Sequence, residues 1–123
     1  YIHFLTFSQN IDKKHTKIET RYRKGKYKAA FNGNKKLIKT LQNSSSSGEN
    51  LSRAYGNQAL ISQSLYNFSS MEGNINSALN QIEKIPSTSP LKSSNYLIIS
   101  ETYYEHGNCL LANDFHNLAV AGL

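Results

Sequence analysis

The fold is decided by the stretch YLIISETYYEHGNCLLANDFHNLA, which covers residues 96–119. Ile99 and Tyr103 lie four positions apart, on one face of a helix, and Gly107 then interrupts the apolar pattern. Small residues follow at Ala112 and seven positions later. A glycine in this place is typical of the left-handed residue that ends a helix. The stretch therefore predicts two helices joined by a tight turn at Gly107.

A similar pattern precedes this stretch by 34 residues. The matching pairs are Leu65 and Ile99, Gly73 and Gly107, and Ala78 and Ala112. A fixed period of this length indicates repeated helix–turn–helix units. It predicts that Gly73, like Gly107, ends a helix.

Helix-capping and helix-breaking residues divide the rest of the chain. Asn10 or Asp12 can cap a first helix, and Gly25 ends it. Ser89 can cap a later helix whose first residue is Pro90. Ser46 and Glu49 fit a capping box. No segment has the alternating pattern of a strand, so we expect an all-α fold. The expected helices cover residues 10–24, 26–41, 48–71, 74–85, 90–106 and 108–121.

The pattern around Gly107 resembles the tetratricopeptide-repeat family, whose units carry aromatic and small residues at these positions. Tyr96, Tyr103 and Ala119 complete the match in the last third of the chain. A length of 123 residues predicts a single domain over residues 1–123. The resemblance implies that this domain is built from about three antiparallel helix–turn–helix units stacked as a short TPR-like solenoid. The units would cover residues 10–43, 46–86 and 89–121, and the domain would be a fragment of a longer protein.

In this family the first helix of each unit lines a concave groove. The resemblance therefore implies that one set of residues faces a bound peptide, with basic groups near the N-terminus and acidic groups near the C-terminus. These are His15, Glu19, Tyr22 and Arg23, then Gln63, Asn67, Ser70 and Met71, and finally Leu97, Glu101, Tyr104 and Glu105.

The function implied by the resemblance is a non-enzymatic module that binds a protein or peptide, which can be a domain of the same parent chain. Such modules often serve as sensory or scaffolding domains of bacterial signalling proteins. The composition, rich in Ser, Asn and Tyr, favours a periplasmic setting, whereas the basic N-terminal segment favours the cytoplasm beside a membrane anchor. The balance favours the periplasm slightly, and it leaves room for an anchor outside these residues.

Positive charge is concentrated near the N-terminus. Residues 10–40 hold eleven Lys or Arg against two acidic residues, a net charge of +9. This asymmetry gives the alternative function, a binder of anionic surfaces through segment 13–39. An acidic protein or a lipid is the favoured partner, and nucleic acid is disfavoured because no nucleic-acid motif accompanies the charge. The basic patch comprises Lys13, Lys17, Arg21, Lys24, Lys26 and Lys28.

The sequence contains few residues that could form a catalytic or metal site. His106, Cys109, Asp114 and His116 are the one cluster with suitable residue types, but a zinc site needs four ligands around one centre. Cys109 is instead expected in the core, and it is the single cysteine, which excludes an internal disulfide. We expect no catalytic residue, no metal and no cofactor.

Overall fold

The computed structural model describes residues 6–44 and 48–122. Within these ranges the chain forms six α-helices and no strand, which confirms the all-α prediction. The helices are α1 (Phe7–Arg23), α2 (Tyr27–Gln42), α3 (Gly48–Ser64), α4 (Phe68–Ile82), α5 (Pro90–His106) and α6 (Cys109–Ala121).

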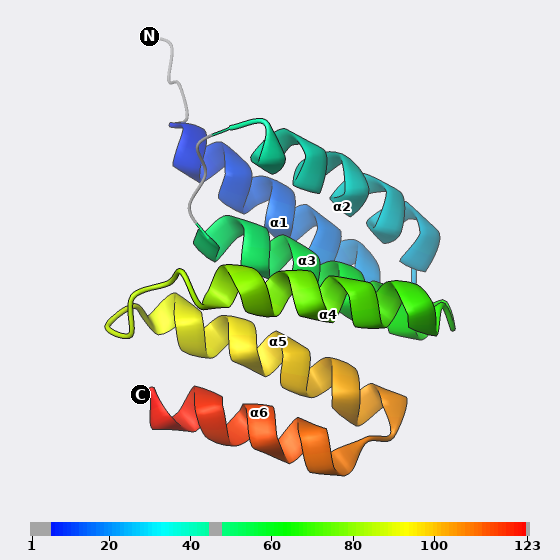
Figure 1. Cartoon of the computed structure of the whole chain (residues 1–123). Helices are drawn as coiled ribbons and strands as arrows, with labels where there is room; N and C mark the ends of the chain where they lie inside the picture. Colours follow the sequence, from blue (N-terminus) through cyan, green and yellow to red (C-terminus); the bar gives the residue numbers. More distant parts are fainter. Residues whose placement is uncertain (1–5, 45–47, 123) are drawn as a thin grey trace, which may run out of the picture.

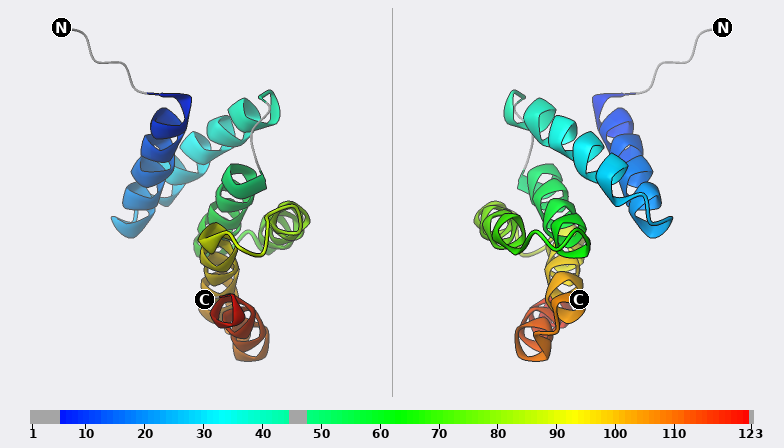
Figure 2. Two further views of the ribbon diagram at one scale, coloured as in Figure 1. Left: turned by 90° about the vertical axis from the view of Figure 1, so that its left-hand side faces the viewer. Right: turned by 90° about the vertical axis from the view of Figure 1, so that its right-hand side faces the viewer.

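The helices succeed one another through the molecule, from α1 and α2 at one end to α6 at the other (Figure 1). Two further views show α4 to one side of a column formed by α3, α5 and α6 (Figure 2). Among the described residues α3 is the central element, because it contacts α1, α2, α4 and α5. The side chains of α3 therefore decide how the two ends of the molecule are joined.

The turns after α1, α3 and α5 have one common geometry. In each, a residue with positive φ ends the first helix: Gly25 at 79°, Tyr66 at 59° and Gly107 at 88°. These residues are 41 positions apart, at 25, 66 and 107. In each turn, two successive backbone N–H groups donate to carbonyls three and five residues earlier, at distances of 2.9–3.0 Å. This is the hydrogen-bond pattern that satisfies the last carbonyls of a helix.

The predicted turn at Gly73 is wrong. Gly73 lies inside α4, whereas α3 ends at Ser64 and the turn falls at Tyr66. A bulky residue rarely takes a left-handed conformation, so Tyr66 gives no signal of a turn. The 34-residue pairing thus aligns a glycine inside a helix with one that ends a helix. The third helix therefore starts at Gly48 as predicted but ends earlier, and the fourth helix starts earlier than predicted.

The ends of the other helices were better predicted. Ser89 caps α5, Pro90 is its first residue and Gly107 follows its last turn, as expected. The first helix begins earlier than Asn10, because the Thr6 side chain accepts from the N–H of Gln9 and Gln9 returns a hydrogen bond to Thr6. This is a capping box, which places the start of the helix three residues before the predicted Asn10. The capping box predicted at Ser46 lies outside the described residues.

Two apolar clusters form the core, and each joins α3 to one end of the molecule. One lies between α3 and the helices that follow it; its buried members are Ala59, Met71, Ile75, Ala78, Ile82, Ile85, Ile99, Tyr103 and Ala112. The other lies between α3 and the two preceding helices; its buried members are Ile11, Ile18, Ala30, Leu37, Leu41, Ala54 and Ile61. The packing of these side chains fixes the helix faces that remain open.

Candidate functional site

A pocket of about 260 Å³ opens where α1, α3 and α5 lie next to one another. We call it the central pocket. Each of the three helices contributes both apolar and polar side chains to its wall. The lining residues are Ile18, Glu19, Tyr22 and Arg23 of α1, Asn57, Leu60 and Ile61 of α3, and Leu97, Ile98 and Glu101 of α5.

The apolar part of the wall comes mainly from α3 and α5. Leu60 and Ile61 are almost fully buried, whereas the Leu97 side chain is 45% exposed. Helix α5 can come this close to α3 because residue 56 is glycine: a Cβ at Gly56 would lie 3.1 Å from Cγ2 of Ile98. The pocket thus has a fixed apolar floor, and the exposed Leu97 and the half-buried Ile98 of α5 are available to a ligand.

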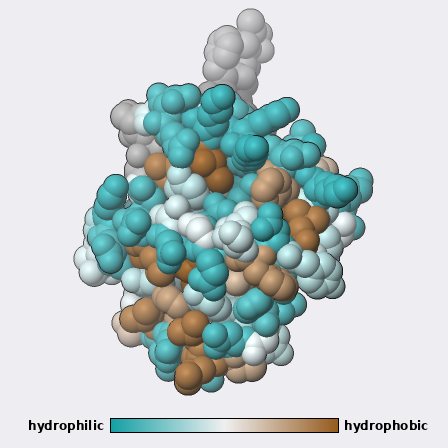
Figure 3. All heavy atoms as spheres, turned by 45° about the vertical axis from the view of Figure 1, so that its right-hand side comes forward, coloured by the Kyte–Doolittle hydropathy of each residue, from teal (hydrophilic) through white to brown (hydrophobic). Residues whose placement is uncertain are grey.

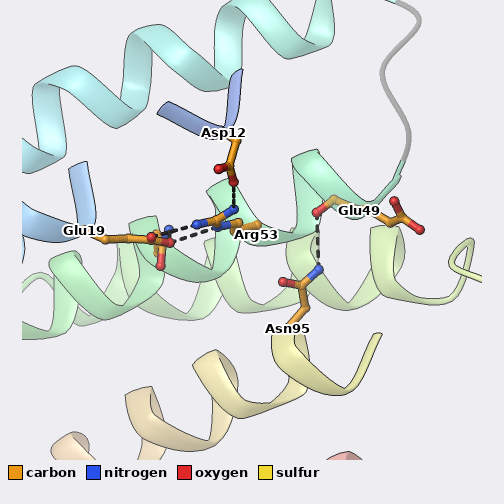
Figure 4. Close-up of polar contacts among 6 residues, drawn as sticks. Asp12, Glu19, Glu49, Arg53 and Asn95 are labelled. Carbon is orange, nitrogen blue, oxygen red and sulfur yellow. Dashed lines mark hydrogen bonds and ion pairs between the residues drawn. The ribbon is translucent and has the colours of Figure 1, made fainter. Parts of the chain in front are cut away.

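A network of charged side chains that joins α1 to α3 fixes the polar side of the pocket. Arg53 donates to both carboxylate oxygens of Glu19, at 2.8 and 2.9 Å, and to Asp12 at 2.9 Å (Figure 4). Asn57 donates to Glu19 at 2.8 Å. Burial raises the pKa of Glu19. The hydrogen bonds from Arg53 and Asn57, together with the positive charge of Arg53, outweigh this effect and hold the pKa below its usual value. Glu19 is therefore a fixed anion.

The rim of the pocket carries opposite charges. Arg23 extends from α1 and Glu101 from α5, and both are exposed. Burial and the nearby charge of Glu105 raise the pKa of Glu101, and Arg23 partly offsets this. The Tyr22 hydroxyl lies 3.1 Å from Oγ of Ser64, which ties α1 to α3 beside the opening. The arrangement can receive an apolar group between a cation and an anion.

Several of the predicted groove residues meet in the central pocket. Glu19, Tyr22, Arg23, Leu97 and Glu101 all line it, although they come from two helices that are far apart in sequence. The prediction missed the α3 residues, which are Asn57, Leu60 and Ile61. It assigned the α3 part of the groove to residues 63–71 because it placed the end of that helix at Gly73.

Other predicted groove residues lie elsewhere. His15 and Met71 are fully buried, so the expectation that they face a groove is wrong. Gln63 is also buried, and it donates to the Glu105 carbonyl at 3.2 Å. Asn67 caps α4 by accepting from the N–H of Ser70.

Three further groove predictions lie outside the pocket wall. Tyr104 is 65% exposed but is not among the residues of the wall. Ser70 and Glu105 are likewise outside the lining set. Ser70 has its hydroxyl 2.9 Å from that of Ser62, a contact between α4 and α3.

The predicted basic patch divides into two parts. Lys17 and Arg21 line a second hollow, between α1 and α2. Lys13, Lys24, Lys26 and Lys28 are exposed and lie outside both hollows. On the face drawn in Figure 3, hydrophilic side chains cover most of the upper part, whereas apolar ones gather toward the lower end.

Cys109 is exposed, contrary to the expectation that it fills the core. Within residues 6–44 and 48–122, no group of three or more His, Cys, Asp or Glu side chains gathers as metal ligands do. Over the same residues, no helix combines the length and the apolar character needed to cross a bilayer.

Comparison with models of known protein families, with curated proteins and with solved structures found no match. We therefore infer the function from the geometry of the two hollows.

Proposed function

We propose that the chain is a non-enzymatic binding module that holds an extended segment of a protein or peptide in the central pocket. The observation that carries this proposal is the wall itself: apolar side chains of α3 and α5 between charged rims on α1 and α5. Small, mostly apolar hollows with a few oriented polar groups are typical ligand sites. Because Glu19 is engaged by Arg53 and Asn57, it is poorly placed to transfer a proton, which supports binding without catalysis.

The charges indicate the orientation of the bound segment. An apolar side chain of the peptide would contact Leu97 and Ile98. An acidic residue on one side of it would face Arg23, and a basic residue on the other side would face Glu101 and Glu105. The preferred peptide therefore carries an acidic, an apolar and a basic residue in that spatial order.

We further propose that the three helix pairs are repeat units, as in tetratricopeptide-like arrays, but with a longer period. The equal spacing of the turns at Gly25, Tyr66 and Gly107 supports a unit of 41 residues, against the 34 of the tetratricopeptide family. Stacked helix pairs create extended surfaces that bind other proteins, which agrees with a pocket lined by the first helix of each pair. A role as the sensory or scaffolding part of a larger signalling protein belongs to the same proposal.

The test is a titration of the ¹⁵N-labelled chain with blocked heptapeptides followed by NMR. Each peptide carries one central Leu, Ile or Phe between an Asp and a Lys, and each is made in both orders. We expect shift changes at Asn57, Leu60 and Leu97, and a preference for one order of charges.

Two variants make the test specific. Leu97→Ala removes an exposed apolar contact of the pocket and should weaken binding about tenfold, the usual effect of losing a few methyl groups from an apolar contact. Leu110→Ala is the matched control, because Leu110 is 75% exposed on α6, outside the pocket. Equal affinities of the two variants, or no binding of any peptide, would refute the proposal.

A further inference from the structure

The second hollow lies between α1 and α2 and has a volume of about 240 Å³. We call it the basic groove. Its charged lining consists of cations only, and it includes two basic residues outside the predicted patch. The lining residues are Lys14, Lys17, Ile18 and Arg21 of α1, and Gly33, Lys36, Leu37 and Thr40 of α2.

Helix geometry explains why these cations converge. The α1 residues are spaced by three, one and three positions, and the α2 residues have the same spacing, so each set forms one stripe along its helix. Ile18 and Leu37 are buried beneath and form the floor. A Cβ at Gly33 would lie 3.2 Å from Nη1 of Arg21, so the guanidinium group lies directly over this glycine. The two stripes thus place Lys14, Lys17, Arg21 and Lys36 around one hollow.

No carboxylate balances this charge among the described residues. The two acidic residues of α1, Asp12 and Glu19, are both engaged by Arg53 of α3. The ion pairs of the described chain are those of Arg53, so none involves a cation of the basic groove. Four like charges that share a hollow repel one another, and a multivalent anion between them removes this repulsion.

We propose that the basic groove binds a small phosphoryl anion, of the diphosphate or phosphate-monoester class. Its volume of about 240 Å³ can hold a compact anion, and its purely cationic charged lining favours a densely charged one. The planar guanidinium group of Arg21 can donate two parallel hydrogen bonds to two phosphate oxygens, and the lysine ammonium groups add positive charge. The Thr40 hydroxyl, which now donates to the Lys36 carbonyl, is a neutral donor at the edge of the same hollow. This site does not depend on the peptide site proposed above.

The test is calorimetric titration of the chain with inorganic pyrophosphate, with orthophosphate and sulfate for comparison, at low and at moderate salt. We expect saturable one-to-one binding that is tightest for pyrophosphate and that weakens as salt rises. The groove variant Lys17→Gln/Lys36→Gln should bind at least tenfold more weakly, because charge-assisted hydrogen bonds are lost. Arg21→Lys keeps the charge but loses the planar guanidinium group, so its affinity should fall several-fold.

The matched control is Lys24→Gln/Lys28→Gln, which removes the same charge from the exposed residues outside the groove. It should change the affinity for pyrophosphate less than about twofold, as expected for screened surface charges. Circular dichroism checks that each variant keeps its helices. Equal weakening by both pairs, or no binding of pyrophosphate, would overturn the proposal. It would also fail if phosphatidylserine vesicles or duplex DNA bound more tightly than pyrophosphate and both pairs weakened that binding equally.

Discussion

Helix α3 packs against α1 on one side and against α5 on the other, and these two interfaces use different chemistry (Figure 4). On the α1 side, Arg53 pairs with Asp12 and Glu19 beside the buried His15; we call this the charged interface. On the α5 side, Asn95 donates to the Glu49 carbonyl and to the Ser52 hydroxyl, and Nδ1 of His106 lies 2.9 Å from Oε1 of Gln63. Because no ion pair joins α3 and α5 among the described residues, we call this the neutral interface. The central pocket is lined by residues of α1, α3 and α5, the three helices that form these interfaces.

Because their chemistry differs, the two interfaces should respond to different substitutions and to pH in different ways. Charged groups and a buried imidazole make the α1 side sensitive to pH and to the loss of a single partner. The neutral interface depends instead on a close approach of helices, at Gly56 and Ile98, and is sensitive to added volume. Two kinds of substitution should therefore separate the two sides.

The largest expected effect is the loss of the Arg53 side chain. Arg53→Met leaves Glu19, whose side chain is only 20% exposed, without its cation. We expect the free energy of unfolding to fall by about 3 kcal/mol, near the lower end for a broken buried pair because both side chains keep some contact with water. Urea denaturation measures this. The double variant Arg53→Met/Glu19→Gln should regain a large part of the loss, and a double variant no better than the single one would argue against the charged interface.

The next effect is pH dependence from His15. Burial, with help from the charge of Arg53, lowers the pKa of His15 from 6.5 to about 4, although Glu19 and Asp12 act in the opposite direction. The unfolded chain therefore binds the extra proton first, and stability that is complete above pH 6.5 is lost as the pH falls toward 4. Between pH 7 and pH 5 we expect a loss of about 2 kcal/mol.

His15→Phe tests this origin, because phenylalanine fills a similar volume and does not titrate. Unfolding of this variant should change little between pH 7 and pH 5. A variant as pH-sensitive as the unmodified chain would show that another group is responsible.

The neutral interface is challenged by added volume. Gly56→Val places branched carbons against Ile98, where a Cβ alone already lies 3.1 Å from Cγ2. Overpacking of this kind should cost about 1.5 kcal/mol, and the cost should be the same at pH 7 and at pH 5. Thermal unfolding at both values is the measurement. A cost that disappears at low pH would mean that the two interfaces are not independent.

The smallest effect has the opposite sign. Gly73 lies within α4, and nothing approaches the position of an added Cβ within 4 Å. Gly73→Ala should therefore raise the free energy of unfolding by about 0.5–1 kcal/mol, the helix-propensity gain of alanine. If Gly73 ended a helix in a left-handed conformation, the same substitution would destabilise the chain instead. The sign of the change in melting temperature decides whether Gly73 lies inside a helix or at its end.

The predictable part of the fold came from residues whose local preference agrees with the structure. Ser89, Pro90 and Gly107 signal the start and the end of α5, and their signals were correct. Tyr66 was not predictable, because its positive φ contradicts the preference of tyrosine. The conformation is imposed by the packing of α3 and α4 on either side of the turn, which no local pattern contains.

The candidate site was predictable in part: its α1 and α5 residues were predicted, and its α3 residues were not. The residues from α1 and α5, such as Tyr22, Arg23 and Glu101, were found because the adjoining turns carry glycine at Gly25 and Gly107. The α3 residues were missed because an error in one turn shifts every position counted from it. The basic groove was missed because it depends on Lys36 of α2 packing opposite α1, a contact between helices that charge counting does not reveal.

Hydrogen exchange measured residue by residue at pH 7 and pH 5 tests the difference between the two interfaces most directly. At pH 5 His15 gains a proton only when the charged interface opens and exposes it, so opening costs less free energy there than at pH 7. Protection factors of amides in α1 and α2 should therefore fall more at pH 5 than those in α4, α5 and α6. In His15→Phe this difference should be small. Equal loss of protection in all helices, or a larger loss in α5 and α6, would contradict the account.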